Sequence, residues 1–472
     1  MTHRAFQTDD QLAFASLSGD FNPMHVDECA ARRLLFGKPV VHGMHAVLWS
    51  LNEWCGSQEQ PVALCTLRAD FQRPILVGTR VGLEVRADGQ DGTEVVLRSD
   101  GKTFLRLRFA WTPTESPEEF PGVIQDLLPA SSECVLREET SLEGVSGATP
   151  LLLARREAAA LFPRVFALLP TRQLATLLAT TRVVGMECPG LHSLYSSASL
   201  DFSDPPVGLG SRDHSLRYLV ESVDRRFHLA TMRVESPGAS GLLRAFVRPA
   251  PRAQLDFAAA CSMVKPGSFH GRRAWVVGGS RGLGEVAAKL LAAGGAEVTI
   301  TYHRGADDAS RVASEIRQGG GVAEIRQLNV LHAPDSAQPL GAGDVPTDML
   351  YFATPFIAPG DDPAFSSRLF DTYCEYYVHG FVRLAAALAP HGLRRVFFPS
   401  SVYVNDPPQN FAEYAAAKAA GEAACLGLEK AYPGLVVHKP RLPRVATDQT
   451  VSLAGREADD PAPLILDALR VS

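Results

Sequence analysis

The feature that most constrains the fold is a strand, a glycine-rich turn, a helix and a second strand in the C-terminal part of the chain. The apolar run Trp275-Val276-Val277 is typical of a buried strand, and the turn after it is Gly278-Gly279-Ser280-Arg281-Gly282-Leu283-Gly284. A helix is predicted from there to Leu291, and another strand over residues 298–301. This spacing is typical of a parallel sheet with crossover helices. We therefore predict an α/β, doubly wound parallel sheet of the Rossmann type over residues 272–472.

The glycine-rich turn also predicts a site for a dinucleotide. Gly278, Gly282 and Gly284 allow a tight turn and let backbone amides approach a pyrophosphate at the start of a helix. The other members of this candidate cofactor-binding loop are Ser280, Arg281 and Leu283. A glycine-rich turn alone is a weak signal, so the prediction depends on residues further along the chain.

Three polar residues predict chemistry at a carbonyl group. Tyr414 and Lys418 are four positions apart and share one helix face, and Ser401 follows the strand-like run 395–399. A phenol, with a pKa near ~10, is a poor acid or base until a nearby ammonium stabilises its phenolate. Lys418 can do this and also hold a nicotinamide ribose. Ser401 can hydrogen-bond the substrate oxygen while Tyr414 donates a proton as hydride reaches carbon.

The glycine turn, Ser401 and the Tyr414-x-x-x-Lys418 pair together resemble the short-chain dehydrogenase/reductase family, in particular its 3-oxoacyl-thioester reductases. The resemblance implies a ketoreductase with a 3R product and a homo-oligomer. The sequence departs from the family pattern at Val277 (usually Thr) and at Asn329 (usually the Asp that holds adenine). Asn329 can still hydrogen-bond the base.

Two further departures fall near the proposed chemistry. Phe352-Ala353-Thr354-Pro355 replaces the family's Asn-Asn-Ala-Gly, and Tyr377, three residues before Gly380, stands where an asparagine usually anchors a proton-relay water. These differences leave open whether the site is catalytically active.

The charges after the second strand favour NADP(H). An acidic residue there would bind the ribose 2′-hydroxyl of NAD, but the strand ends in Thr301-Tyr302-His303-Arg304. Arg281 and Arg304 could instead bind a 2′-phosphate through two hydrogen bonds each. His303 and Asn329 complete the predicted cofactor residues. The alternative is that both arginines are solvated surface residues.

Two linker-like stretches divide the rest of the chain. Residues 112–122 and 248–271 are rich in proline with glutamate or glycine, which predicts units over 1–112, 123–247 and 272–472. The first two units share an apolar helix-like stretch (44–54 and 158–178), Asp-Phe-x-x-Pro (70–74 and 201–205), a glycine (Gly78 and Gly210) and alternating runs. This predicts a duplicated α+β unit of one helix and a curled antiparallel sheet. The alternative is that the two units share this pattern by chance.

The N-terminal unit contains an Asp and a His on either side of a rigid Asn22-Pro23 turn. Asp20 and His25 are five positions apart and can point into one pocket. Such a pair can position and deprotonate a water and return a proton to carbon. Gly43 begins the apolar helix, where its amide could bind a thioester oxygen as it gains enolate charge. The alternative is a helix cap (Asp20) and a core histidine (His25).

The run Gly19-Asp20-Phe21-Asn22-Pro23-Met24-His25, with His42-Gly43 downstream, resembles the signature of the MaoC-like, R-specific enoyl-CoA hydratases of the hot-dog fold. The resemblance implies that Asp20 and His25 are catalytic and that the Gly43 amide holds the thioester carbonyl. The second unit lacks such a run, since His192 has no Asp or Asn-Pro nearby. We therefore predict an α+β double hot-dog region whose degenerate second unit is catalytically mute.

Composition excludes several classes of protein. The formal net charge is −6 without a basic stripe, which argues against nucleic-acid binding. No apolar run reaches ~18 residues, and residues 1–7 lack the apolar core of a signal peptide. The 8 cysteines form no CxxC pair, which favours reduced thiols over disulfides or zinc. We expect a cytoplasmic protein without a metal, membrane or nucleic-acid partner.

Together the two sites predict a bifunctional enzyme on acyl thioesters of coenzyme A or acyl carrier protein. The C-terminal site would reduce a 3-oxoacyl thioester with NADPH, and the N-terminal site would interconvert the 3-hydroxyacyl and 2-enoyl thioesters by syn loss or gain of water. Three alternatives stay open. They are the breakdown direction with NAD(P)+, an active hydratase with a non-catalytic dinucleotide-binding module, and two structural relics. The acyl chain, the carrier and the pathway cannot be read from the sequence.

Overall fold

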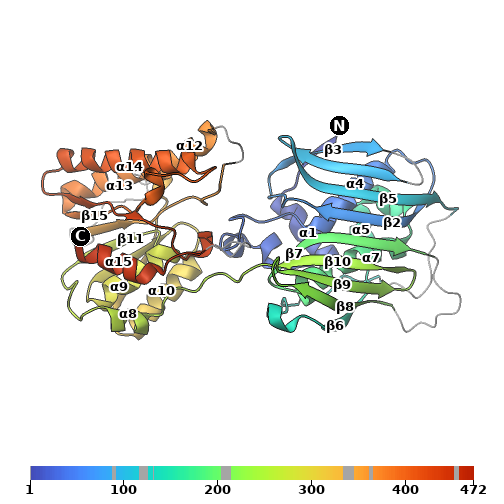
Figure 1. The fold of residues 1–472 in the computed structure, drawn as a ribbon, viewed down its shortest axis with the longest axis horizontal. Coiled ribbons are helices and arrows are strands. Elements are labelled where there is room, and N and C mark those ends of the chain that lie inside the picture. The colour runs from blue at the N-terminus through green and yellow to red at the C-terminus, as the bar shows by residue number, and fades with distance from the viewer. Residues whose placement is uncertain are drawn as a thin grey trace. The chain divides into compact units, whose positions relative to one another are not determined.

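The computed structural model describes residues 2–87, 92–115, 126–130, 132–203, 214–332, 345–360, 365–450 and 457–471. The chain divides into two compact units, Met1–Ala250 and Pro251–Ser472, coloured blue to green and yellow to red in Figure 1. Most of the linker predicted at 112–122, the boundary at residue 123 and the repeat residues Asp204, Pro205 and Gly210 lie outside the described residues.

One antiparallel sheet of 10 strands runs through the N-terminal unit, in the order β1-β3-β4-β5-β2-β7-β10-β9-β8-β6. The order is symmetric about the central β2–β7 pair, because β5, β4 and β3 continue outward from β2 as β10, β9 and β8 do from β7 (Figure 1). The strands are β1 (Thr2–Ala5), β2 (Val62–Phe71), β3 (Arg80–Ala87), β4 (Thr93–Ser99), β5 (Lys102–Pro113), β6 (Ser146–Pro150), β7 (Ser193–Phe202), β8 (Ser215–Asp224), β9 (Leu229–Ser236) and β10 (Ala239–Val247).

Each half of this sheet packs on one buried helix, α4 (Gly43–Cys55) or α7 (Thr171–Arg182). Apolar residues of both helices and of the sheet form a single core, in which burial of side chains is the main source of stability. The arrangement confirms the α+β double hot-dog prediction. The shorter helices are α1 (Thr8–Ser18), α2 (Pro23–Val26), α3 (Glu28–Ala31), α5 (Arg155–Leu161) and α6 (Pro163–Leu168).

One predicted element of the second half was wrong. The apolar stretch 158–178 is not one helix but parts of α5, α6 and α7. Pro163 is the first residue of α6, and Pro170 directly precedes α7. Proline has no N–H to continue a helix and is tolerated only in the first turn, so each proline begins a new helix.

The C-terminal unit contains a parallel sheet of 6 strands in the order β13-β12-β11-β14-β15-β17. In chain order this is 3-2-1-4-5-6, the order of a doubly wound dinucleotide-binding fold, as predicted. Its strands are β11 (Arg273–Val277), β12 (Glu297–Tyr302), β13 (Val322–Gln327), β14 (Asp348–Tyr351), β15 (Arg395–Phe397) and β17 (Val436–His438). A separate short pair joins β16 (Ser400–Ser401) to β18 (Arg441–Leu442).

Helices cover both faces of the parallel sheet (Figure 1). Successive side chains of a strand point to opposite faces, and β11 shows the result. Ala274 and Val276 pack with one helix set, and Trp275 and Val277 pack with the other. The first set is α8 (Phe257–Met263), α9 (Gly282–Ala293), α10 (Ala306–Gln318) and α15 (Pro461–Val471), and the second is α12 (Ser367–Cys374), α13 (Phe381–Leu388) and α14 (Ala412–Ala431). No helix of the described residues is long and apolar enough to cross a membrane.

Candidate functional site

Asp20 and His25 lie together in the interior of the N-terminal unit. Asp20 follows Gly19, which ends α1 in the left-handed conformation with φ 78°. His25 lies in α2, which begins at Pro23 and is capped by Asn22, whose Oδ1 accepts a 3.1 Å hydrogen bond from the Met24 amide. The rigid cap and the left-handed turn therefore bring the carboxylate and the imidazole to one place, as the motif predicts.

The tautomer of His25 is fixed by its surroundings. Its Nδ1 lies 2.7 Å from the carbonyl oxygen of Val40. Because a carbonyl oxygen only accepts, Nδ1 carries the proton and Nε2 keeps its lone pair. Burial lowers the pKa of His25, and Asp20 opposes this in part. His25 therefore presents an unprotonated nitrogen near neutral pH.

The carboxylate of Asp20 is buried and accepts two hydrogen bonds. Thr181 Oγ1 donates to Oδ2 at 2.7 Å, and the amide of Asn22 donates to Oδ1 at 3.2 Å. Burial raises the pKa of Asp20, while the charge of His25 and the Thr181 hydrogen bond lower it. A carboxyl group in this environment can exchange a proton more readily at neutral pH than an exposed one.

Residues of the second half of the unit lie against this carboxylate, which the sequence did not predict. Thr181 lies on α7, and the π-helical turn Val183–Glu187 (η2) directly follows that helix. A methyl group at Gly185 would lie 2.1 Å from Asp20 Oδ1, so a side chain there would displace the carboxylate. The Gly185 carbonyl also accepts a 2.9 Å hydrogen bond from Asn22 Nδ2. The second half therefore contacts the Asp20 site, although it lacks the motif.

Arg248, just after β10, is a second contribution of that half. It is 2% exposed, and its guanidinium donates to the carbonyls of Ser193 at 3.3 Å and Leu191 at 2.5 Å. Asn22 Nδ2 donates to the same Leu191 carbonyl at 3.3 Å. Burial lowers the pKa of Arg248 to about 10. Its charge lowers the pKa of His25 and so favours the neutral imidazole.

His42 packs against His25 with ring centroids 3.8 Å apart. Its Nδ1 lies 2.9 Å from Gln11 Oε1, and its Nε2 lies 2.9 Å from the Asp20 carbonyl. Asp20, His25 and His42 have ligand atoms within 4.8 Å of one another, but both nitrogens of His42 already face oxygen atoms. The three residues therefore do not suit a metal ion. The contacts of His42 instead hold the loop that carries Asp20.

Gly43 is the first residue of α4, as predicted. A methyl group on it would lie 2.8 Å from the ring of Phe71, so a side chain would close the space above the helix start. Amides of the first helical turn have no partner within the helix, and such an amide can bind an oxygen that gains negative charge.

The predicted residues of the C-terminal site also come together. Ser401 lies in β16, and Tyr414 and Lys418 lie one turn apart on α14. The Tyr414 hydroxyl is hydrogen-bonded to Ser401, and this lowers a Tyr414 pKa that burial raises. Lys418 Nζ lies 5.9 Å from the centroid of the Tyr414 ring. Burial lowers the pKa of Lys418 to about 7.

The glycine-rich loop has the shape that a pyrophosphate needs. Gly278 has φ 79° and Gly282 has φ 56°, both left-handed. A methyl group at Gly284 would lie 2.3 Å from the Gly278 carbonyl. Thr301 holds the loop by accepting from the amides of Gly278 (3.3 Å) and Gly279 (3.1 Å). Ser280 and Leu283 belong to the same loop, and α9 begins at Gly282.

The other predicted cofactor residues follow neighbouring strands. His303 and Arg304 come after β12, and Asn329 comes after β13. Because carboxyl ends of adjacent parallel strands meet at one edge, these residues lie on the same edge as the glycine-rich loop. Asn329 Oδ1 accepts a 3.1 Å hydrogen bond from the Leu331 amide, so this oxygen stabilises its own turn.

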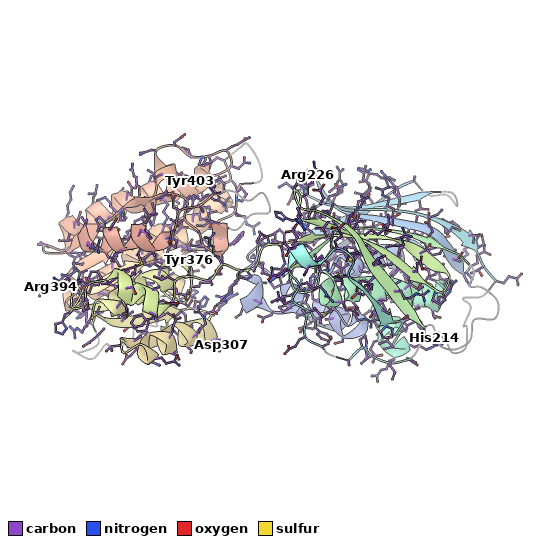
Figure 2. The ribbon with its side chains drawn as sticks, turned by 60° about the horizontal axis from the view of Figure 1, so that its bottom comes forward. His214, Arg226, Asp307, Tyr376, Arg394 and Tyr403 are labelled. Atoms are coloured by element: carbon purple, nitrogen blue, oxygen red, sulfur yellow. The ribbon has the colours of Figure 1, made fainter. Side chains whose placement is uncertain are left out.

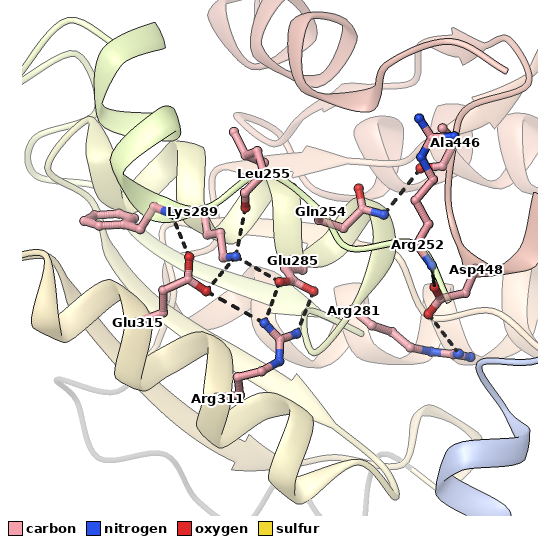
Figure 3. Close-up of polar contacts among 11 residues, drawn as sticks. Arg252, Gln254, Leu255, Arg281, Glu285, Lys289, Arg311, Glu315, Ala446 and Asp448 are labelled. Atoms are coloured by element: carbon pink, nitrogen blue, oxygen red, sulfur yellow. Dashed lines mark hydrogen bonds and ion pairs between the residues drawn. The ribbon is translucent and has the colours of Figure 1, made fainter. Parts of the chain in front are cut away.

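Arg281 has an acidic neighbour that the sequence did not predict. Its guanidinium lies 3.8 Å from Asp448 Oδ2 (Figure 3), and the other carboxylate oxygen accepts a 3.0 Å hydrogen bond from the amide of Arg252. A phosphate bound by Arg281 would therefore share the guanidinium with Asp448.

Tyr377 lies in a π-helical turn, Glu375–Gly380 (η4), where the sequence differs from the resemblance. Its hydroxyl lies 2.6 Å from Thr354 Oγ1. Figure 2 labels Tyr376, which directly precedes Tyr377, and Tyr403, which lies two residues after Ser401; both belong to the C-terminal unit. The amide of Tyr403 donates a 3.2 Å hydrogen bond to Ser401 Oγ and so orients that hydroxyl.

Comparison with known protein families gives two matches. Residues 2–102 match the MaoC like domain, and residues 272–450 match the short chain dehydrogenase family. The (R)-specific enoyl-CoA hydratase of Aeromonas caviae is 36% identical over 85 residues, which are 17% of this chain and 62% of that protein. The chain thus spans less than two thirds of this relative. Both resemblances drawn from the sequence are confirmed.

Two solved structures are similar to the C-terminal unit. A short chain dehydrogenase from Burkholderia cenocepacia in complex with NADP is 24% identical, with 43% of this chain and 91% of that chain covered and a TM-score of 0.38. A 3-oxoacyl (acyl-carrier-protein) reductase from Agrobacterium tumefaciens with NADP bound is 20% identical, with 43% and 87% covered and a TM-score of 0.38.

Proposed function

We propose that this chain, which joins a MaoC-like domain to a short-chain dehydrogenase domain, is a bifunctional enzyme that acts on acyl thioesters. The N-terminal unit interconverts 2-enoyl and 3-hydroxyacyl thioesters, and the C-terminal unit reduces 3-oxoacyl thioesters with NADPH. The observation that supports the first activity best is the buried Asp20–His25 pair with its fixed tautomer. The second activity is supported by Tyr414 hydrogen-bonded to Ser401, one helical turn from Lys418.

In the hydration direction, the Asp20–His25 pair acts on one water. His25 takes a proton at Nε2 as the water oxygen bonds to C3 of the enoyl group, and the buried pair returns one proton to C2. Water is thereby added without net change in the protonation of the site. The Gly43 amide binds the thioester oxygen while it carries enolate charge. Dehydration is the reverse of the same steps.

In the reduction, Ser401 and Tyr414 bind the 3-oxo oxygen. Tyr414 donates its hydroxyl proton to that oxygen, and the protonated Lys418 stabilises the phenolate that results. NADPH supplies the hydride when it is bound. The glycine-rich loop fits its pyrophosphate, since Gly278 and Gly282 are left-handed and a side chain at Gly284 would collide with the loop.

The preference for NADPH is supported by charge. His303 and Arg304 follow β12, where NAD-dependent proteins of this fold place an acidic residue for the ribose. Arg304 and Arg281 are the candidate ligands of a 2′-phosphate. The carboxylate of Asp448 would compete with a phosphate for the Arg281 guanidinium. We expect Arg304→Ala to weaken NADPH binding much more than NADH binding in a fluorescence titration.

The two activities can be tested separately on the full chain. Crotonyl-CoA hydration should fall at least ~100-fold in Asp20→Asn and His25→Gln, while NADPH oxidation with acetoacetyl-CoA is unchanged. In Tyr414→Phe, crotonyl-CoA hydration should be unchanged while NADPH oxidation is lost. With acetoacetyl-CoA as the only substrate, mass spectrometry should find hydroxybutyryl-CoA only when Tyr414 is present. Full hydration by both N-terminal variants would contradict the hydratase proposal, and Tyr414-independent reduction would contradict the assignment of the reductase site.

A non-catalytic, dinucleotide-binding C-terminal unit remains the second candidate. It is favoured by the buried Lys418, whose Nζ donates a 2.8 Å hydrogen bond to the Pro399 carbonyl and whose pKa is lowered to about 7. An uncharged lysine would not stabilise a Tyr414 phenolate. NADPH binding without oxidation, on coenzyme A and carrier-linked 3-oxoacyl substrates alike, would establish this candidate.

A further inference from the structure

Lys418 lies among aromatic rings. Its Nζ lies 3.9 Å from the centroid of the Tyr377 ring, 4.9 Å from that of Phe398 and 5.9 Å from that of Tyr414. Its hydrogen-bond acceptor is the neutral carbonyl of Pro399. Within the described part of the chain, Lys418 makes no ion pair. A buried ammonium requires compensation for its lost hydration, and the ring faces are the partners at hand.

Tyr377 has the shortest of the three ring distances, and its ring is held in place. Thr354 Oγ1 donates to the Pro355 carbonyl at 2.9 Å, so the Tyr377 hydroxyl must donate the 2.6 Å hydrogen bond to Thr354. Tyr373 stacks on Tyr377 with ring centroids 5.9 Å apart and an interplanar angle of 5°. Tyr377 is 1% exposed. The ring therefore has one orientation, with its face toward Lys418.

We propose that Tyr377 is a positioning residue of the reductase site, whose ring face holds the Lys418 ammonium beside Tyr414 and Ser401 while Thr354 fixes the ring. The role of Lys418 in catalysis rests on the proposed reductase function, but the contact itself does not. Thr354 and Tyr377 lie in the two stretches where the sequence departs from its resemblance, and one hydrogen bond joins them. The two departures thus form one structural unit.

The contact has a consequence that can be measured. A cation over the face of a buried aromatic ring is attracted by the ring quadrupole. Burial lowers the pKa of Lys418, and the titratable groups of Cys425 and Glu422 on the same helix oppose this. A ring face that stabilises the ammonium acts in the same direction as those two groups. Loss of the ring at constant burial should therefore lower this pKa further. The alkaline limb of ketoreduction should then move to lower pH.

The test uses the full chain with ¹³C-labelled lysine. The Lys418 resonance is assigned by its loss in Lys418→Met and titrated by NMR, without cofactor or substrate. Tyr377→Leu, which removes the ring, should lower the Lys418 pKa by about one unit. Tyr377→Phe, which keeps the ring, should shift it by less than half as much. The matched control is Trp275→Leu in the same core, whose ring contacts Arg326 on β13 and which should lower the melting temperature without changing the Lys418 pKa.

Two results would overturn the proposal: an unchanged Lys418 pKa in Tyr377→Leu, or an equal shift in Tyr377→Phe, which would assign the effect to the hydroxyl. If Tyr377→Leu does not fold, Thr354→Val tests the same contact, because a loosened ring should also lower the pKa and no change would contradict the proposal. If the wild type neither binds NADPH nor reduces a 3-oxoacyl thioester, the reductase function fails, while the lysine titration still decides the role of Tyr377.

Discussion

Single side chains far apart in the sequence complete the proposed hydratase site. Thr181 is 161 positions from Asp20 and donates to its carboxylate, and Gly185 leaves the space in which that carboxylate lies. Neither residue belongs to a motif. A threonine inside a helix and a glycine after it are ordinary in sequence, so their role is visible only when α7 is packed beside the catalytic loop.

Thr181→Val should impair hydration. The variant keeps the shape of the side chain but removes the 2.7 Å hydrogen bond to Asp20 Oδ2. A hydrogen bond to a charged group contributes about 1.5–3 kcal/mol, which corresponds to a loss of about ten- to a hundredfold in crotonyl-CoA hydration. Thr180→Val is the matched control, because the Thr180 hydroxyl donates to the Leu177 carbonyl. Equal rates in the two variants would refute the role of Thr181.

Gly185→Ala should lower the rate of hydration more than the small size of the added methyl group suggests. The added methyl group would lie 2.1 Å from Asp20 Oδ1, and the carboxylate would have to move. A displacement of a catalytic group by about 1 Å costs roughly a hundredfold in rate. Gly92→Ala is the control, since a methyl group there meets nothing within 4 Å. A lower steady-state rate of crotonyl-CoA hydration, with unchanged NADPH oxidation, would locate the effect in the N-terminal site.

The pH dependence of hydration follows from His25. Burial lowers its pKa, so Nε2 stays unprotonated to a lower pH than in an exposed histidine. The acid limb of kcat/KM for crotonyl-CoA should therefore have its midpoint below the usual value of about 6.5. Replacement of Arg248 by methionine removes a positive charge that also lowers this pKa, and the acid limb should then move to higher pH. A shift in the other direction would contradict the assignment.

At the scale of elements, a buried ion network fixes α9 and α10. Glu285 accepts from Lys289 Nζ at 2.9 Å and from both terminal nitrogens of Arg311 at 2.9 Å (Figure 3). Lys289 also lies 2.8 Å from Glu315, which in turn accepts from the Phe257 amide at the start of α8. The network therefore joins three helices on one face of the parallel sheet, next to the glycine-rich loop.

Glu285→Gln should destabilise the C-terminal unit. The Lys289 side chain is 2% exposed, and loss of the Glu285 charge leaves it with the partly exposed Glu315. We expect a cost of about 1.5–3 kcal/mol, the range for a hydrogen bond to a charged group. Asp467→Asn is the control, since that side chain is 76% exposed and its pair with Arg470 contributes less than about 1 kcal/mol. Urea unfolding followed by circular dichroism measures both. An equal effect of the two variants would show that the network is not stabilising.

At the scale of the whole molecule, each site is built inside one unit. All residues described around Asp20, from Gln11 to Arg248, belong to Met1–Ala250, and those of the Ser401 site belong to Pro251–Ser472. We therefore expect the proposed hydration to require the second hot-dog half but not the C-terminal unit.

A fragment of residues 1–250 should accordingly hydrate crotonyl-CoA at a rate comparable with the full chain. A fragment that ends at residue 112 should be inactive, because it lacks Thr181, Gly185 and Arg248 and half of the core around α4 and α7. The measurement is the rate of crotonyl-CoA hydration by the two purified fragments and the full chain at equal concentration. Activity in the shorter fragment would show that the second half is dispensable for hydration.

The sequence by itself determined the two fold classes and the residues that carry local motifs. The apolar run Trp275-Val276-Val277, the glycine turn, the Asp20–His25 run and the Tyr414–Lys418 spacing are local patterns, and local geometry is set by neighbours along the chain. Only the tertiary structure decided what surrounds those residues. Thr181, Arg248, Asp448 and Tyr377 meet their partners through packing between distant elements. Such contacts depend on three-dimensional proximity, for which a single sequence carries no periodic signal.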